Sequence, residues 1–362
     1  MKAGIVTCED SFEAVQELFH DKRWSDGLPI VPPTRERIEA TLDALGEDPD
    51  EVIAVVAPAD GELSWAKLVA NCVMAGCRTE HVPVVLAAVR GVCAPEFNLA
   101  GVQGTTGPHA PAVIVNGPVR DELGINSGTG CFGPGARANA VIGRALRLVL
   151  QNVGGAVPGV MDMATFGHPG KYTFCFGEKE EASPWEPLSV ERGFATDVST
   201  VTVAACAAPQ GVSDNTSTTA ERYLRTIRGG LLNAGLSHYY LFGRGQELTL
   251  VLGPERAREL ADAGMSKQDV REFIFHAARL PKHELMDIGM YSTRDWPRWA
   301  ETIDGDGRIP LVAAPEKVVV VVAGGAGRHS AILPMWTSSV SVTRPIGEPV
   351  PTSTSEPGGP DA

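Results

Sequence analysis

The run of five valines from Val318 to Val322 constrains the fold most, because a strand of this composition is apolar on both faces. Such a strand has to be covered on both sides, which is typical of a sheet with helices packed against it. Further strands are predicted at Val52–Val56, Ala112–Val115, Thr200–Cys206, Tyr239–Phe242 and Leu248–Leu252. Predicted helices alternate with them. The sequence therefore predicts an α/β fold, with helices interleaved with a buried, partly parallel sheet.

Helical periodicity is the second signal in the chain. Glu80–Val92 is apolar almost all round, which predicts a buried helix. Pro254 stands at a favoured first helical position, and Ser266 with Asp269 forms a capping box. The other predicted helices are Ser11–Arg23, Thr34–Gly46, Glu62–Gly76, Ala138–Asn152 and Thr218–Ala234, and Pro281–Pro315 is predicted to be irregular.

The composition of the sequence changes near Gly155, after which polar residues of several kinds separate short segments with strand-like patterns. We therefore expect two lobes, residues 1–155 and 156–342. Residues 343–362 are rich in Pro, Ser, Thr and Gly without an apolar pattern, which predicts a disordered tail. No internal repeat of fixed period is visible.

The net charge of the 362-residue chain is -13, which argues against nucleic acid or anionic lipid as the main partner. A small anion stays possible if basic residues gather in a cleft. The N-terminus lacks an apolar run of signal-peptide type, and no segment has the apolar length that spans a bilayer. We therefore expect a cytoplasmic protein whose 7 cysteines are thiols.

A glycine-rich loop, Asn126–Gly135, runs directly into the predicted helix that ends at Asn152. Backbone N–H groups at such a helix start, beside the positive end of the helix dipole, form a ready anion site. The candidate substrate-binding residues here are Gly133, Gly135, Arg137 and Asn139, and Arg144 adds charge. The Lys-Ser/Thr pair of a nucleotide P-loop is missing. Alternatively, the glycines serve only to give the loop its backbone angles for packing.

Thr165–Glu181 holds the strongest candidate for acid/base chemistry. His168 is flanked by glycines and a proline, which predicts an exposed turn, and histidine titrates near neutrality. Lys171 follows at once and is able to clamp a carboxylate or phosphate, and Cys175 comes next. The alternative is a surface loop whose acids, from Glu178 onward, are solvated.

Cys77 is the candidate reactive thiol, because it lies between two predicted helices beside Arg78, where a cation favours the thiolate. Cys72 lies inside the preceding helix and is expected in the core. The spacing of these two cysteines and His81 matches no standard zinc site, so no metal site is predicted.

Ala323–Ser330 follows the valine strand and has half of a dinucleotide fingerprint. Ser330 replaces the third glycine, and no acidic residue follows at the required distance, which argues against NAD. The sequence identifies no other cofactor. Open α/β sheets bind ligands at such strand ends, so Arg328 and His329 are candidate substrate-binding residues.

Four segments resemble one bacterial family, which is known mainly as uncharacterised. They are DGLPIVPPT, NCVMAGCRTEHVPVVLAAV, NSGTGCFGPGARANAVIGRALRL and TFGHPGKYTF continued by CFGEKEEASPWEPL. Members of this family are similar to proteins encoded beside, or joined to, UGSC-motif (seleno)proteins. The resemblance extends to about Arg279 and includes AGGAGRHS. It implies thiol-linked or reductive chemistry, with the UGSC motif on a separate partner, and it assigns no catalytic residue.

We therefore expect a cytoplasmic enzyme or catalytic subunit acting on an anionic metabolite, thiol- or redox-linked to a UGSC-type partner, and a homo- or hetero-oligomer. The alternatives are a lyase or hydrolase without redox chemistry, and a non-catalytic substrate-binding subunit. The candidate catalytic residues are His168, Lys171, Cys77 and Cys175. One pocket is expected to join the Gly133–Asn139 helix start to the His168–Lys171 turn.

Overall fold

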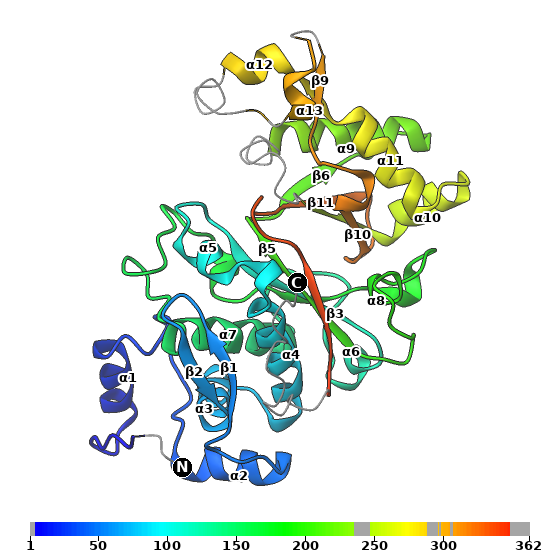
Figure 1. The fold of residues 1–362 in the computed structure, drawn as a ribbon. Coiled ribbons are helices and arrows are strands. Elements are labelled where there is room, and N and C mark those ends of the chain that lie inside the picture. The colour runs from blue at the N-terminus through cyan, green and yellow to red at the C-terminus, as the bar shows by residue number, and fades with distance from the viewer. Residues whose placement is uncertain (1–3, 235–246, 288–295, 297, 305–306, 348–362) are drawn as a thin grey trace, which may run out of the picture.

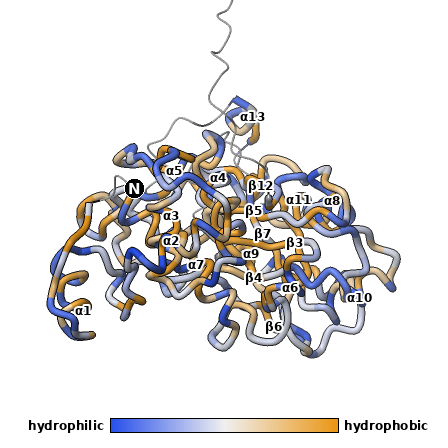
Figure 2. Tube along the Cα trace, turned by 90° about the horizontal axis from the view of Figure 1, so that it is seen from below, coloured by the Kyte–Doolittle hydropathy of each residue, from blue (hydrophilic) through white to orange (hydrophobic). Residues whose placement is uncertain are grey.

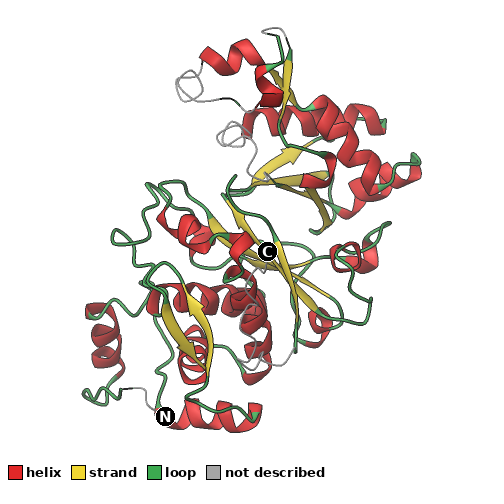
Figure 3. Ribbon diagram, in the orientation of Figure 1, coloured by secondary structure: helices red, strands yellow, loops and turns green. Residues whose placement is uncertain are grey.

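The chain is described here by a computed structural model, in which residues 4–234, 247–287, 296, 298–304 and 307–347 are placed. It is built on two four-stranded sheets, each with its own helices (Figures 1 and 3). Hydrophobic residues concentrate along the strands and helices at the centre of the molecule (Figure 2). The prediction of an α/β fold with interleaved helices and a partly parallel sheet is confirmed.

The first sheet has the strand order β12-β5-β3-β4. Its strands are β3 (Ala110–Asn116), β4 (Cys175–Gly177), β5 (Thr200–Cys206) and β12 (Val342–Pro345). β3 and β4 are parallel, and the other neighbours are antiparallel. The helices α3 (Trp65–Ala75), α4 (Val82–Val92) and α7 (Arg137–Asn152) share one hydrophobic core with this sheet. α4 is buried nearly all round, as its composition predicts.

The second sheet has the order β10-β7-β11-β6. Its strands are β6 (Gln210–Ser213), β7 (Leu248–Leu252), β10 (Val318–Val322) and β11 (His329–Pro334). β7 and β10 are parallel, and β11 is antiparallel to β7 and β6. α9 (Ala220–Ala234), α10 (Pro254–Asp262) and α11 (Lys267–Ala277) pack into the second core. The predicted capping box of Ser266 and Asp269 begins α11.

The remaining elements lie around these two sheets. They are α1 (Phe12–Asp21), α2 (Arg35–Leu45), β1 (Val52–Val56), β2 (Gly61–Ser64), α5 (Leu99–Gly104), α6 (Val119–Glu122), α8 (Leu188–Glu191), β8 (Arg279–Pro281), α12 (Lys282–Asp287), α13 (Arg298–Glu301) and β9 (Arg308–Pro310). Gly61–Ser64 is a strand, so the helix predicted from Glu62 starts at Trp65 instead. The strand predicted at Tyr239–Phe242 lies outside the described residues.

The two sheets meet through a third hydrophobic cluster, which contains residues of both, such as Ile114, Ala204, Val321 and Leu333. At their junction Ala207 donates a backbone hydrogen bond to Pro334 (2.7 Å), and Trp336 donates one to Ala205 (2.8 Å). These reciprocal bonds form an antiparallel bridge between Cys206 and Met335, which joins the ends of β5 and β11.

The two units share one topology. Each has a pair of parallel strands connected through helices, which is β3 and β4 in the first unit and β7 and β10 in the second. An antiparallel strand lies beside the first strand of each pair, β5 beside β3 and β11 beside β7. The fourth strand of each sheet is exchanged between the units. β6 follows β5 of the first sheet along the chain but joins the second sheet, and β12 follows β11 of the second sheet but joins the first. The chain therefore contains a structural repeat that the sequence does not reveal.

This exchange corrects the predicted boundaries. β4 and β5 lie beyond Gly155 but belong to the same sheet as β3, so the chain passes between units after Cys206 and not at residue 155. The predicted tail starts too early at residue 343, because Val342–Pro345 pairs with β5. Residues 348–362 lie outside the described part of the chain. Pro281–Pro315, predicted irregular, contains α12, α13 and β9.

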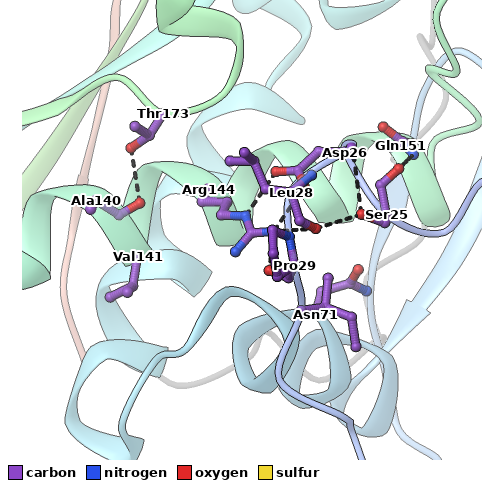
Figure 4. A network of polar contacts seen from close by, with 12 residues as sticks. Ser25, Asp26, Leu28, Pro29, Asn71, Ala140, Val141, Arg144, Gln151 and Thr173 are labelled. Carbon is purple, nitrogen blue, oxygen red and sulfur yellow. Dashed lines mark hydrogen bonds and ion pairs between the residues drawn. The ribbon is translucent and has the colours of Figure 1, made fainter. Parts of the chain in front are cut away.

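α7 anchors the N-terminal connector Asp26–Thr34 (Figure 4). Arg144 donates two hydrogen bonds of 2.8 Å to the carboxylate of Asp26 and one of 2.9 Å to the Pro29 carbonyl. Gln151, two turns further on, donates to the carbonyls of Arg23 and Ser25. Arg144, suggested above as a charge near the glycine-rich loop, is thus paired with Asp26.

Within the described residues, no single helix is both long and apolar enough to cross a membrane. The consecutive helical segments Trp65–Ala75 and Thr79–Val92 have that length and apolarity only together, and a bend of 115° separates them.

Candidate functional site

A cavity of about 360 Å³ lies between two glycine-rich loops, one from each unit. Thr129–Gly133 forms one wall, and the segment from Ala323 to Gly327 forms the other, with His329 beside it. The cavity stands at the carboxyl ends of the parallel strands β7 and β10, where open α/β sheets bind ligands. The fold thus brings together Gly133 and His329, two predicted substrate-binding residues that are distant in sequence.

Glycine is required where the two loops meet. The N–H of Gly324 donates a hydrogen bond of 2.8 Å to the carbonyl of Ser127. A Cβ atom at Gly325 would collide with the side chain and the Cα atom of Thr129. The close approach of the units therefore explains part of the glycine content of Ala323–Ser330, in addition to the freedom of its backbone.

Two titratable side chains line this cavity, His329 and Cys131. His329 is exposed at the start of β11. Cys131 is only 6% exposed, and burial raises the pKa of its thiol to about 11, although backbone N–H groups and Lys179 oppose the shift. The ring of Phe132 packs edge-on against that of Phe176, with 4.7 Å between centroids. The cavity thus offers an accessible imidazole and a protonated thiol.

α10 begins at the cavity. Gly253 lines the cavity and is the N-cap of this helix, and no side chain caps it. Pro254 has no N–H, so the N–H groups that follow it, with the positive end of the helix dipole, lie beside this wall. Glu255 accepts a hydrogen bond of 3.0 Å from the N–H of Gly327, which fixes the opposite loop.

The other predicted substrate-binding residues lie outside the cavity. Gly135 and Arg137 are exposed at the start of α7. Asn139 is buried, and its amide binds both backbone groups of Asn126 at 2.8 and 2.9 Å. The guanidinium of Arg328 donates to the carbonyl of Ser217 at 2.6 Å and pairs with Glu259. Asn139 and Arg328 therefore hold the loops that form the cavity.

His168 and Lys171 occupy a separate place, at the short 3-10 helix Pro169–Lys171. His168 is half-buried, not exposed as predicted, and burial lowers its pKa while the Cys206 carbonyl opposes that shift. Lys171 binds both carboxylate oxygens of Asp162, at 2.8 and 2.9 Å. It lines a second, smaller cavity of about 10 Å³.

The expectation of one shared pocket is not met. The cavity at Gly133 and the cavity at Lys171 have no lining residue in common. The ring of Phe174 packs against His168 on one side (6.1 Å between centroids) and against Phe132 on the other (6.0 Å). The segment after the His168 turn contacts the first half of α7, where Thr173 donates to the carbonyls of Asn139 and Ala140 and lies against Gly143.

Cys77 and Cys175 line neither cavity. Cys77 is half-buried, and its thiol lies 3.5 Å from the carbonyl of Val141. A hydrogen bond with Cys77 and burial raise the pKa of Cys72 well above its usual value. Cys175 is buried in β4, and burial raises its pKa far above the ordinary range. These thiols lie within the first core.

A buried polar network was missed by sequence reasoning. Glu178, which the alternative interpretation placed among solvated acids, is fully buried at the end of β4. It accepts hydrogen bonds from Asn116 (2.7 Å) and the N–H of Leu188 (2.8 Å), with Lys267 at 3.9 Å. Burial raises its pKa, and Lys267 opposes that shift. The sequence signal for this network was Asn116, a polar residue at the end of the otherwise apolar strand β3.

This network occupies the place in the first unit that corresponds to the glycine cavity. Cys175 lies opposite Val113 of β3, and Val320 lies opposite the equivalent residue of β7, Leu250. Glu178, three residues after Cys175, therefore corresponds to Ala323, three residues after Val320. Leu188 packs into the cluster between the sheets beside it. The glycine cavity thus has a small residue at this position, where the first unit has a hydrogen-bonded glutamate.

Comparison with known proteins gives no match to a family model, a curated protein or a solved structure. The resemblance to the UGSC-associated family therefore stays a prediction. The residues that surround the glycine cavity are the basis for assigning a function.

Proposed function

We propose that the chain is an enzyme, or a catalytic subunit, that acts on a small anionic metabolite bound in the glycine cavity. The cavity itself carries this proposal, because its volume of about 360 Å³ suits a small molecule and it lies at the carboxyl ends of β7 and β10. Both walls consist of glycine-rich backbone, which lets a ligand approach main-chain N–H groups closely.

Local positive potential supports an anionic ligand in spite of the net charge of -13. The amino end of α10 lies at the cavity through Gly253. The Nζ atom of Lys179 lies 3.8 Å from the Cβ position at Gly128, beside the Thr129–Gly133 wall. These groups attract an anion without requiring a charged side chain inside the cavity.

His329 is the residue proposed for proton transfer, because its imidazole is accessible, lines the cavity and has one nitrogen that accepts and one that donates a proton. Cys131 is proposed as a hydrogen-bond donor to the ligand, since its raised pKa keeps the thiol protonated at neutral pH. The thiol-linked version of the proposal adds a separate UGSC-type redox partner, which rests on the resemblance alone. Lyase or hydrolase chemistry requires no partner.

Thermal shift and calorimetric titration with phosphate, small carboxylates and uncharged analogues test the proposal. Anions are expected to raise the melting temperature, and uncharged analogues are not. Ala326→Trp, at an exposed lining position, is expected to abolish binding, while the exposed Ala263→Trp leaves it unchanged. Binding that survives Ala326→Trp would contradict the proposed location.

Turnover of a ligand found in this way separates an enzyme from a binding subunit. His329→Gln is expected to lower turnover by roughly 10²–10⁴-fold with little change in affinity, whereas the exposed His276→Gln has no effect. If the ligand binds and His329→Gln leaves its conversion unchanged, His329 has no catalytic role. If no conversion is found at all, the substrate-binding subunit is the better interpretation.

A further inference from the structure

A buried ion cluster holds the segment between α7 and β4. Asp162, whose side chain is 4% exposed, pairs with Lys171 at 2.8 Å and with Arg147 at 3.2 Å. Arg147 also donates a hydrogen bond of 3.0 Å to the carbonyl of Ala156. The side chains of Lys171 and Arg147 are only 15% and 10% exposed. Both cations therefore have little contact with water.

The charges of this cluster do not balance. Asp26, the other carboxylate that acts on Arg147, forms its own pair with Arg144. Among the described residues, three cations therefore face two carboxylates, and one positive charge is left in excess. A charge withdrawn from water and left without compensation is costly, so the cluster favours a further negative group.

His109 supplies hydrogen-bonding capacity at the same place. The residue is only 6% exposed, and neither ring nitrogen has a hydrogen-bond partner among the described residues. Burial, with His168 and Lys171, lowers the pKa of His109 to about 4, so the ring is neutral at pH 7 and carries one N–H donor. A buried donor without an acceptor destabilises a protein, so this N–H favours a hydrogen-bond acceptor in the cavity.

The cavity of about 10 Å³ lies where these groups meet, and its lining includes His109, Arg147 and Lys171. This volume holds roughly one water-sized particle. We propose that it is a binding site for one small anion of the halide class, held by the ammonium of Lys171, the guanidinium of Arg147 and the imidazole N–H of His109. A water molecule satisfies the donors but not the excess charge, and a carboxylate or phosphate is too large.

The site is independent of the glycine cavity, with which it shares no lining residue. An anion bound here ties α7, through Arg147, to the segment that carries Asp162 and Lys171. It therefore stabilises the folded chain by an amount that grows with the logarithm of the free anion concentration above the dissociation constant.

Thermal unfolding of the full chain in sodium chloride and in sodium gluconate, at equal ionic strength, tests the proposal. Gluconate is too large for the site. Chloride and bromide are expected to raise the melting temperature by roughly 2–4 °C at ten times the dissociation constant, with a further rise that follows the logarithm of the anion concentration. Equal melting temperatures in chloride and gluconate at all concentrations would overturn the proposal.

His109→Phe removes the donor and fills the cavity, and it is expected to abolish the difference between chloride and gluconate. His20→Phe, at an exposed position of α1, is the matched control and is expected to retain it. A difference that persists in His109→Phe, or that disappears equally in His20→Phe, would contradict the assigned site. Ala326→Trp is expected to retain the chloride effect, which separates this proposal from that for the glycine cavity.

Broadening of the ³⁵Cl NMR signal by the wild-type chain provides a second test that needs no variant. Excess bromide is expected to reverse the broadening by competition, and gluconate is not. Absence of specific broadening at chloride concentrations that raise the melting temperature would show that the stabilisation arises elsewhere.

Discussion

At the scale of single residues, burial decides the protonation of the groups beside both cavities. It raises the pKa of Cys131 to about 11 and lowers that of His109 to about 4. Sequence alone suggests a histidine near neutrality at every such position, as it did for His168. Burial of one residue depends on contacts from elements far along the chain, which local patterns do not report.

The titration of His109 leads to a prediction about acid stability. In chloride-free buffer, the unfolded chain binds a proton on His109 near pH 6.5, whereas the folded chain does so only near pH 4. Acidification between these values therefore favours unfolding, by on the order of 3 kcal/mol in total. The part of the unfolding free energy that depends on a neutral His109 is fully present above pH 6.5 and lost below pH 4. Urea unfolding across this range measures it, and His109→Phe is expected to show a correspondingly shallower loss.

Thiol accessibility gives a second prediction at this scale. Brief iodoacetamide treatment at neutral pH, followed by mass-spectrometric mapping, is expected to label exposed Cys8 first and half-buried Cys77 next. Cys72, Cys175 and Cys206 are buried, and burial raises the pKa of each thiol, so they are expected to stay unmodified. Labelling of Cys175 ahead of Cys77 would show that the first core opens readily.

At the scale of elements, the sequence predicts those helices and strands whose apolar pattern lies entirely within their own residues. β5 and β7 have the predicted bounds, and α7 begins one residue before its predicted start. β11 was missed because His329 and Ser330 follow a glycine-rich loop, and its pairing with β6 and β7 is non-local. β12 was missed for the same reason, since its Thr, Arg and Pro residues gain strand geometry only by pairing with β5.

β12 gives the prediction for this scale. A chain ending at Gly347 keeps β12 and is expected to unfold at the same urea concentration as the full chain. A chain ending at Ser341 loses the pairing with β5, the buried Val342 and the bond between Thr202 and Thr343. We expect this second truncation to lower the unfolding free energy by about 2–5 kcal/mol. Equal stability of the two truncated chains would show that β12 is dispensable.

At the scale of the whole molecule, the candidate site depends on how the two units meet. The sequence identifies both glycine-rich loops, Asn126–Gly135 and Ala323–Ser330, and even the strand end at which the second one lies. It does not show that they face each other, because this follows from the exchange of β6 and β12 between units. The sequence alone therefore pairs the Asn126–Gly135 loop with His168, which is nearer along the chain, and not with His329.

Gly325 offers a test of this junction. Gly325→Ala places a Cβ atom against Thr129, and we expect the unfolding free energy to fall by about 1–3 kcal/mol, with loss of ligand binding in the glycine cavity. Gly229→Ala is the matched control, because a Cβ there meets nothing within 4 Å on α9, where alanine is expected to stabilise by about 0.5–1 kcal/mol.

The clash at Gly325 also predicts a specific rescue. Thr129→Gly removes the side chain that the new methyl group meets, although the Thr129 Cα atom stays close. The double variant is therefore expected to recover part of the stability lost in Gly325→Ala, by roughly 0.5–3 kcal/mol of coupling in a double-mutant cycle. Strictly additive effects of the two substitutions, measured by urea unfolding, would show that the loops do not touch in solution, and the cavity between them would lose its structural basis.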